Sequence, residues 1–175
     1  AQLRVQTGGV RVNGKVATGT NALRPGSELM VQAGARVELR FESGFLHLGP
    51  GKYRVVSKDG LEITAGQATG SLERDSNLTA FSIWTKPAHL ETRAAWLGIT
   101  VDGATGNFPA KTRLCVGRGA AWVNLGEKSR SSLPVSEGQE IVLQEGLPVT
   151  GLPMASPIWS ARIVDELKSS LPANP

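Results

Sequence analysis

The stretch VELRF at residues 37–41, followed by Ser43-Gly44 and FLHL at residues 45–48, decides the fold. Apolar side chains alternate with polar ones in both segments, and a period of two is typical of a strand with one buried face. The glycine between the two segments permits the tight turn of a hairpin. This part of the chain therefore predicts two neighbouring antiparallel strands.

The same alternation recurs over much of the chain. Further expected strands lie at residues 61–63, 81–84, 97–101, 113–116, 121–123 and 140–143. Turn signals separate them at Asn13-Gly14, Pro25-Gly26, Ala33-Gly34, Pro50-Gly51, Asp59-Gly60, Asp102-Gly103, Glu137-Gly138 and Glu145-Gly146. A spacing of about 8 to 12 residues between turns indicates an all-β domain. The 21 glycines among 175 residues agree with a chain rich in turns.

Only the carboxyl-terminal segment has helical spacing. Ser156 suits the N-cap, and Pro157 suits the first helical position. The apolar residues that follow recur at helical spacing, at Trp159, Ile163, Val164, Leu167 and Leu171. The spacing predicts a helix over residues 157–170. Three prolines and two glycines in residues 146–157 predict a tether before it.

Together these patterns predict an all-β fold: a twisted β-solenoid or sandwich-like body of many short strands, with one amphipathic C-terminal helix. The expected boundaries are residues 1–146 for the β domain and 147–175 for the tether and helix. An isolated helix of about 14 residues is marginal in water, so its apolar stripe must be buried. We expect Trp159, Ile163, Leu167 and Leu171 to form this docking surface, with Trp159 as the anchor. The stripe packs on the chain's own body or on a second copy, and the short tether favours its own body.

Several glycine-rich segments carry a family likeness. In the first half they are GVRVNG at residues 9–14, Gly19, LRPGSEL at residues 23–29, GARVELRF at residues 34–41 and LHL at residues 46–48. In the second half they are residues 81–87, 97–101, 116–123 and 133–142. Over about residues 5–145 the chain resembles FecR-like domains, although residues 94–99 depart from the family pattern of a G-T-x-F strand.

The resemblance implies a β module that lies outside the cytoplasmic membrane and acts through protein contacts. The best-known members of the family relay a transporter's state to a sigma factor across the membrane. These 175 residues contain neither the anti-sigma helices nor the membrane span of that relay. What the resemblance carries to this chain is therefore the module and its compartment.

The start of the chain and its charge bear on compartment and partners. Ala1-Gln2 without an initiator Met predicts a mature chain left by signal peptidase, and the alternative is a piece of a longer protein. We therefore expect a bacterial periplasmic, secreted or cell-surface location. The net charge of +4 is scattered, and the densest stretch, residues 111–118, holds three cations and no aromatic residue. This pattern predicts no nucleic-acid binding.

Few residues suggest chemistry. Cys115, the single cysteine, alternates with Leu114 and Val116, which predicts a buried strand thiol; the alternative is a nucleophile activated by His89. His47 and His89 lack metal-ligand spacing, and the carboxylates are spread singly. We therefore expect no catalytic residue, no metal and no cofactor, and a protein that is not an enzyme.

Three functions remain open. The first is a non-catalytic extracytoplasmic binding or scaffold module that acts on a protein partner. The second is a self-assembling secreted or cell-surface filament subunit that pairs the edges of its own copies, at residues 1–12 and at the proline-rich tail. The third is a carbohydrate-binding module whose exposed aromatic contacts would be Trp84, Trp96 and Trp122. Burial of these tryptophans in the core is the alternative to the third.

Overall fold

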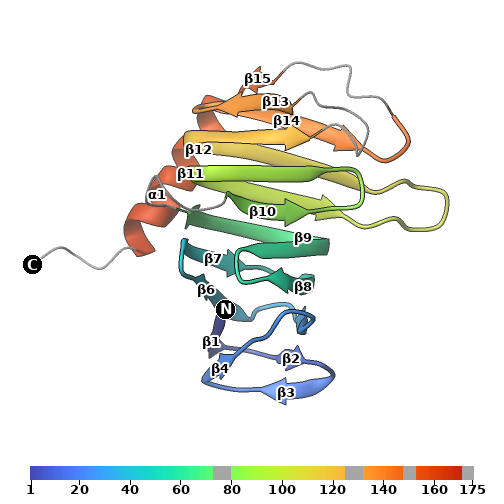
Figure 1. Ribbon diagram of the computed structural model, residues 1–175, viewed down its shortest axis with the longest axis vertical. Helices are drawn as coiled ribbons and strands as arrows, with labels where there is room; N and C mark the ends of the chain where they lie inside the picture. The colour runs from blue at the N-terminus through green and yellow to red at the C-terminus, as the bar shows by residue number, and fades with distance from the viewer. Residues whose placement is uncertain (73–79, 125–131, 148–152, 171–175) are drawn as a thin grey trace, which may run out of the picture.

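The computed structural model describes residues 1–72, 80–124, 132–147 and 153–170. Its strands pair in one 15-stranded sheet, and the described part of the chain has one helix, at the carboxyl end (Figure 1). The elements are β1 (Gln2–Thr7), β2 (Val10–Val12), β3 (Lys15–Ala17), β4 (Thr20–Ala22), β5 (Glu28–Val31), β6 (Arg36–Phe41), β7 (Gly44–Leu48), β8 (Gly51–Ser57), β9 (Gly60–Leu72), β10 (Phe81–Trp84), β11 (His89–Asp102), β12 (Lys111–Asn124), β13 (Ser132–Ser136), β14 (Gln139–Gln144), β15 (Met154–Ala155) and α1 (Pro157–Ser170). The predicted all-β fold with one terminal helix is confirmed, and α1 has the expected bounds.

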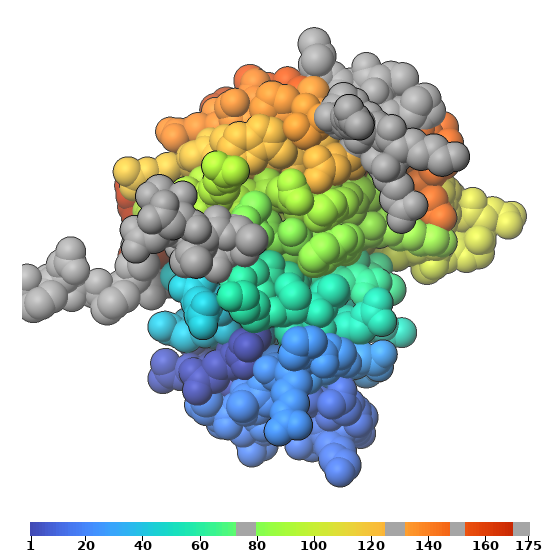
Figure 2. Space-filling view, viewed as in Figure 1, coloured from blue at the N-terminus to red at the C-terminus, as the bar shows by residue number. Residues whose placement is uncertain are grey.

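The pairings arrange the strands in two rows, here called the first and second layers. The first layer runs β3, β2, β5, β8, the beginning of β9, β10, the beginning of β11, the end of β12, and β13. The second layer runs β4, β1, β6, β7, the end of β9, the end of β11, the beginning of β12, β14 and β15. Among the described pairings only β9 with β10 is parallel. From one end of the molecule to the other, the colours pass from the blue amino-terminal residues through green to the orange carboxyl-terminal residues (Figure 2).

The core lies between these layers. Alternate residues of both rows point inward and form one buried apolar cluster. Phe41 of the second layer and Phe81 of the first meet edge to face, with ring centroids 4.7 Å apart. Most strands of both layers thus bury one face, as the period of two in the sequence predicts. The arrangement agrees with the sandwich-like expectation, and the solenoid description stays a prediction.

Three strands are longer than the sequence pattern predicts. β9, β11 and β12 have 13, 14 and 14 residues because each bends from one layer into the other without losing its pairing. Residues 113–116 and 121–123, expected as two strands, are the two halves of β12. The register of β11 with β12 shifts between Thr92 and Ala94 and again between Trp96 and Leu97. Such bulges turn a strand while preserving most of its hydrogen bonds to the neighbouring strand. Turn signals in the sequence mark where strands end, and they do not reveal a bend within a strand.

One buried hydroxyl holds the corner where β9 changes layer. Tyr53 is 2% exposed, and its oxygen lies 2.8 Å from the carbonyl oxygen of Gly49 and 2.7 Å from that of Gln67. The same oxygen accepts a hydrogen bond from the Gln67 amide at 3.0 Å. Burial raises the pKa of Tyr53, so the hydroxyl stays protonated and able to donate.

The prediction that residues 1–12 form an open sheet edge, free to pair with a second copy, is wrong. β1 is paired on both sides, with β4 and β6, and β2 is paired with β3 and β5. The described rows end instead on short strands: β3 and β4 have three residues each, and β15 has two. β13 contains Pro134, which has no amide to donate. Short edges and an edge proline are devices that oppose pairing between copies.

Candidate interaction site beneath and beside the terminal helix

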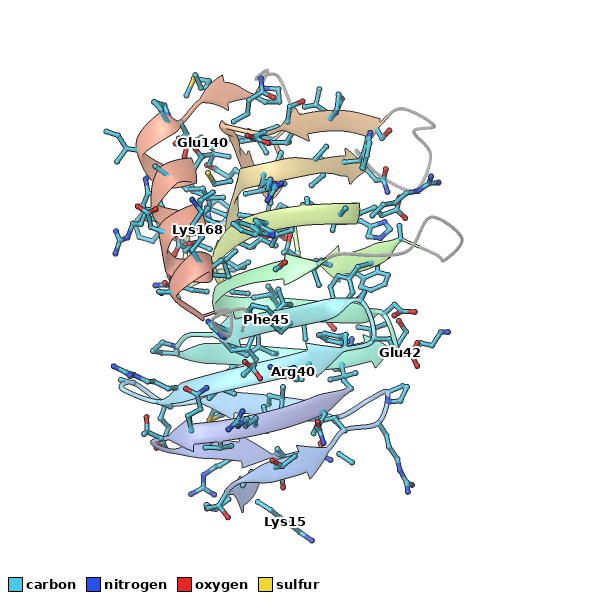
Figure 3. The ribbon with its side chains drawn as sticks, turned by 90° about the vertical axis from the view of Figure 1, so that its left-hand side faces the viewer. Lys15, Arg40, Glu42, Phe45, Glu140 and Lys168 are labelled. Atoms are coloured by element: carbon cyan, nitrogen blue, oxygen red, sulfur yellow. The ribbon has the colours of Figure 1, made fainter. Side chains whose placement is uncertain are left out.

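Helix α1 lies on the outer face of the second layer, across its strands. It contacts β12, β11 and β9. Figure 3 shows it reaching from the neighbourhood of Glu140 at its beginning toward Phe45 at its end. Ser156, the residue before the helix, donates a side-chain hydrogen bond to Glu140 Oε2 at 3.1 Å, and its carbonyl accepts the first helical bond from the Ser160 amide. The N-cap residue therefore also ties the helix to β14.

The sheet beneath the helix is shaped by two glycines in mid-strand. A Cβ atom at Gly98 would lie 2.9 Å from Ile163 Cδ1, and one at Gly117 would lie 3.1 Å from the carbonyl oxygen of Ser160. Both distances are shorter than ordinary carbon contacts, so a side chain at either position would force Ile163 or the helix backbone to shift. Glycine inside a strand pattern is the sequence signal for such a close approach.

The expected internal docking is observed, but its expected anchor is wrong. Ile163 is 3% exposed and Leu167 is 0% exposed, and both pack with Trp96 and Cys115 in a second buried cluster. Trp159 is 41% exposed, because it lies at the side of the helix, where its ring stacks with Arg162 at 5.4 Å. Leu171 lies outside the described residues. Burial of the helix by its own body leaves Ile163 and Leu167 unavailable to a partner while α1 is docked.

Cys115 lies beneath the helix as a buried strand thiol. It is a free cysteine and 3% exposed. Burial and the charge of Glu140 raise the pKa of its thiol to about 11, and a hydrogen bond with Ser156 and the charge of Arg113 act in the opposite direction. A thiol with this pKa is protonated at neutral pH and is a poor nucleophile. His89, its suggested activating base, lies in the first layer, paired with Trp84 and Asn124.

A buried carboxylate lies on the same outer face, beyond the helix. The Glu38 side chain is 8% exposed, accepts a hydrogen bond from Arg40 Nε at 2.5 Å, and lies 3.6 Å from His47 Nε2. Arg4 of β1 is its register partner on the other side. Burial raises the pKa of Glu38, but the hydrogen bond and charge of Arg40, together with His47, outweigh burial and hold the pKa below its ordinary value.

This cluster predicts an acid-sensitive contribution to stability. A carboxyl group whose pKa is lower in the folded state stabilises the fold above its unfolded pKa, and the contribution is lost as the pH falls through the folded pKa. Glu38→Gln should lower the free energy of unfolding by about 1 kcal/mol at pH 7, because Arg40 is largely solvent-exposed. Urea titrations at pH 7 and pH 3 should show this gap closing at pH 3. A gap that is constant or wider at pH 3 would contradict the assigned sign.

The structure distinguishes among Trp84, Trp96 and Trp122, the possible exposed contacts of a carbohydrate-binding module. Trp96 is 6% exposed beneath Arg118 and the helix, so its assignment as an exposed contact is wrong. Trp84 and Trp122 are partly exposed on the outer face of the first layer. Trp84 stacks on His89 with centroids 4.8 Å apart and lies over Gly60. Much of its ring is therefore in contact with the protein, which disfavours it as a platform for a sugar ring.

Within the described ranges, no three His, Cys, Asp or Glu side chains gather as a metal site would require. In the same part of the chain, no helix is long and apolar enough to cross a membrane.

The fold has neighbours among solved structures. Two crystal structures of "a putative anti-sigma factor" from Parabacteroides distasonis, at 2.50 and 1.65 Å resolution, match with TM-scores of 0.58 and 0.57 and sequence identities of 17% and 18%. Each match covers 74% of this chain and 59% of the neighbour, so the chain corresponds to well under two thirds of those proteins. No family model and no curated protein sequence matches. At this identity the likeness establishes a shared all-β fold.

Proposed function

We propose that this chain is a non-catalytic, extracytoplasmic module of the FecR-like type that acts through protein–protein contacts. The observation that carries the proposal is an agreement between two independent lines. The sequence motifs resemble a family whose best-known members relay signals to sigma factors, and two solved structures with this fold are described as those of "a putative anti-sigma factor". Proteins of both kinds work by binding other proteins rather than by turnover.

The alternatives have less support. Self-assembly by strand pairing needs an open edge, and the described edges are short or carry a proline. Carbohydrate binding needs free aromatic faces, and Trp84 is stacked while Trp96 is buried. Burial raises the pKa of the Cys115 thiol, so this residue does not support a mechanism with a cysteine nucleophile.

Site-specific cross-linking in cells tests the proposal. A photo-reactive amino acid would replace Ile158 in the first turn of α1, Phe108 on the β11–β12 loop, or Val16 on β3, which are 83%, 76% and 69% exposed. We expect a discrete adduct with one protein at one of these positions, none at the others, and the chain in the periplasmic or secreted fraction. The proposal fails if no position gives a protein adduct, if the chain stays in the cytoplasm, or if a hydrolase panel shows turnover that a single substitution abolishes.

A further inference from the structure

A polar groove runs along one side of α1. Two adjoining cavities, of about 210 and 490 Å³, share Gln67 and Thr69 of the sheet and Glu166 of the helix. The helix wall of the groove is the stripe Trp159, Arg162, Glu166 and Ser169, whose spacing of three or four residues places them on one helix face. This stripe is next to the one that docks the helix, so the groove is a consequence of the docking.

The floor of the groove crosses the strands of the second layer. Thr100 of β11 pairs with Gln67 of β9 on one side and with Arg113 of β12 on the other. Arg36, the first residue of β6, lines the far end of the groove. From β6 to β12 there are four strand spacings, or roughly 19 Å. An extended peptide of about six residues has this length at ~3.3 Å per residue.

The charges of the groove are unbalanced. Arg113 and Arg162 line one end, and Arg36 lies with His47 at the other. All three arginines are exposed, and none makes an ion pair with any of the described residues. Glu166 is the one carboxylate among the groove-lining residues of the described ranges, and it lies in the middle. Both ends of the groove are thus lined by arginines.

We propose that this groove binds an extended acidic segment of a protein partner, about six residues long, with a carboxylate near each end. The arginines at the two ends pair with these carboxylates, as guanidinium groups do with carboxylate oxygens. The Gln67, Thr69 and Thr100 side chains offer hydrogen bonds to the backbone of the segment. This proposal rests on the proposed function and names the chemistry of its partner.

Peptide pools test the groove directly on the full chain. One pool holds fluorescein-labelled eight-residue peptides with two aspartates four or five positions apart, and the matched pool has asparagine in their place. Fluorescence anisotropy should show binding of the aspartate pool and weakening with added salt. The double variant Arg36→Gln with Arg113→Gln should bind it about tenfold more weakly.

The control removes the same charge elsewhere. Arg24 and Arg93 are exposed and line none of the described cavities. Arg24→Gln with Arg93→Gln should change the affinity less than twofold. The groove assignment is overturned if both double variants lose affinity equally, if the asparagine pool binds as well as the aspartate pool, or if heparin fragments bind wild type and the Arg36/Arg113 variant alike while displacing the peptides.

The two proposals fail separately. A cellular cross-linked partner together with no preference for the aspartate pool would leave the proposed function and refute the groove. Groove-dependent peptide binding together with no protein adduct in cells would support the groove and refute the proposed function.

Discussion

Replacing Leu167 with alanine should lower the free energy of unfolding by about 2–4 kcal/mol. The Leu167 side chain is 0% exposed and lies between α1 and the outer face of the second layer, in contact with Trp96 and Cys115. Alanine leaves a cavity that the paired strands beneath cannot close, so both the transfer energy and the packing of the missing carbons are lost. Denaturant unfolding followed by tryptophan fluorescence measures the change.

Cys115 provides a second readout of the same substitution. It is the single cysteine of the chain and is covered by the docked helix. If α1 opens locally before the body unfolds, Leu167→Ala should raise the rate at which a thiol reagent labels Cys115 in native buffer. Ile158→Ala is the matched control, since Ile158 is 83% exposed on the same helix, and it should leave stability within ±0.5 kcal/mol. An unchanged stability and an unchanged labelling rate in Leu167→Ala would show that the helix is not held by this contact.

Gly119→Ala should be strongly destabilising. Gly119 has a φ of +80°, and it lies where β12 passes from the second layer to the first. A Cβ atom there would lie 2.3 Å from the carbonyl oxygen of Ala94 on the paired strand β11. Alanine therefore adds a backbone clash to the left-handed strain, and we expect a loss of roughly 3 kcal/mol or more. Thermal unfolding by circular dichroism measures it.

Gly138→Ala separates the clash from the strain. Gly138 has nearly the same φ, +77°, but nothing lies within 4 Å of the added Cβ. It should cost only about 1–2 kcal/mol. Equal losses in the two variants would mean that the β12 corner relaxes around the new methyl group.

Much of the fold could be predicted from local patterns. The hairpin of β6 and β7 follows from the alternation in residues 37–41 and 45–48, since apolar and polar residues alternate along a strand with one buried face. The bounds of α1 follow from Ser156, Pro157 and the apolar spacing, all of which act within a few residues of one another. These are short-range effects that a single segment specifies.

The candidate site was less predictable. The apolar stripe of the helix was identified correctly, but Trp159 was chosen as its anchor by size, whereas Ile163 and Leu167 face the sheet. The glycines that admit the helix, Gly98 and Gly117, come from two different strands. The groove arginines come from β6, β12 and α1, and no local pattern links them.

The sequence by itself determined the alternation of the strands, the terminal helix and the need to bury its apolar stripe, because each depends on neighbouring residues along one segment. Only the tertiary structure decided which strands bend through both layers, which helix residues are buried, and that Arg36 and Arg113 line one groove. Those outcomes depend on pairing between segments tens of residues apart. Strand register and layer packing set such distances, and neither is encoded in the spacing of residues within a single segment.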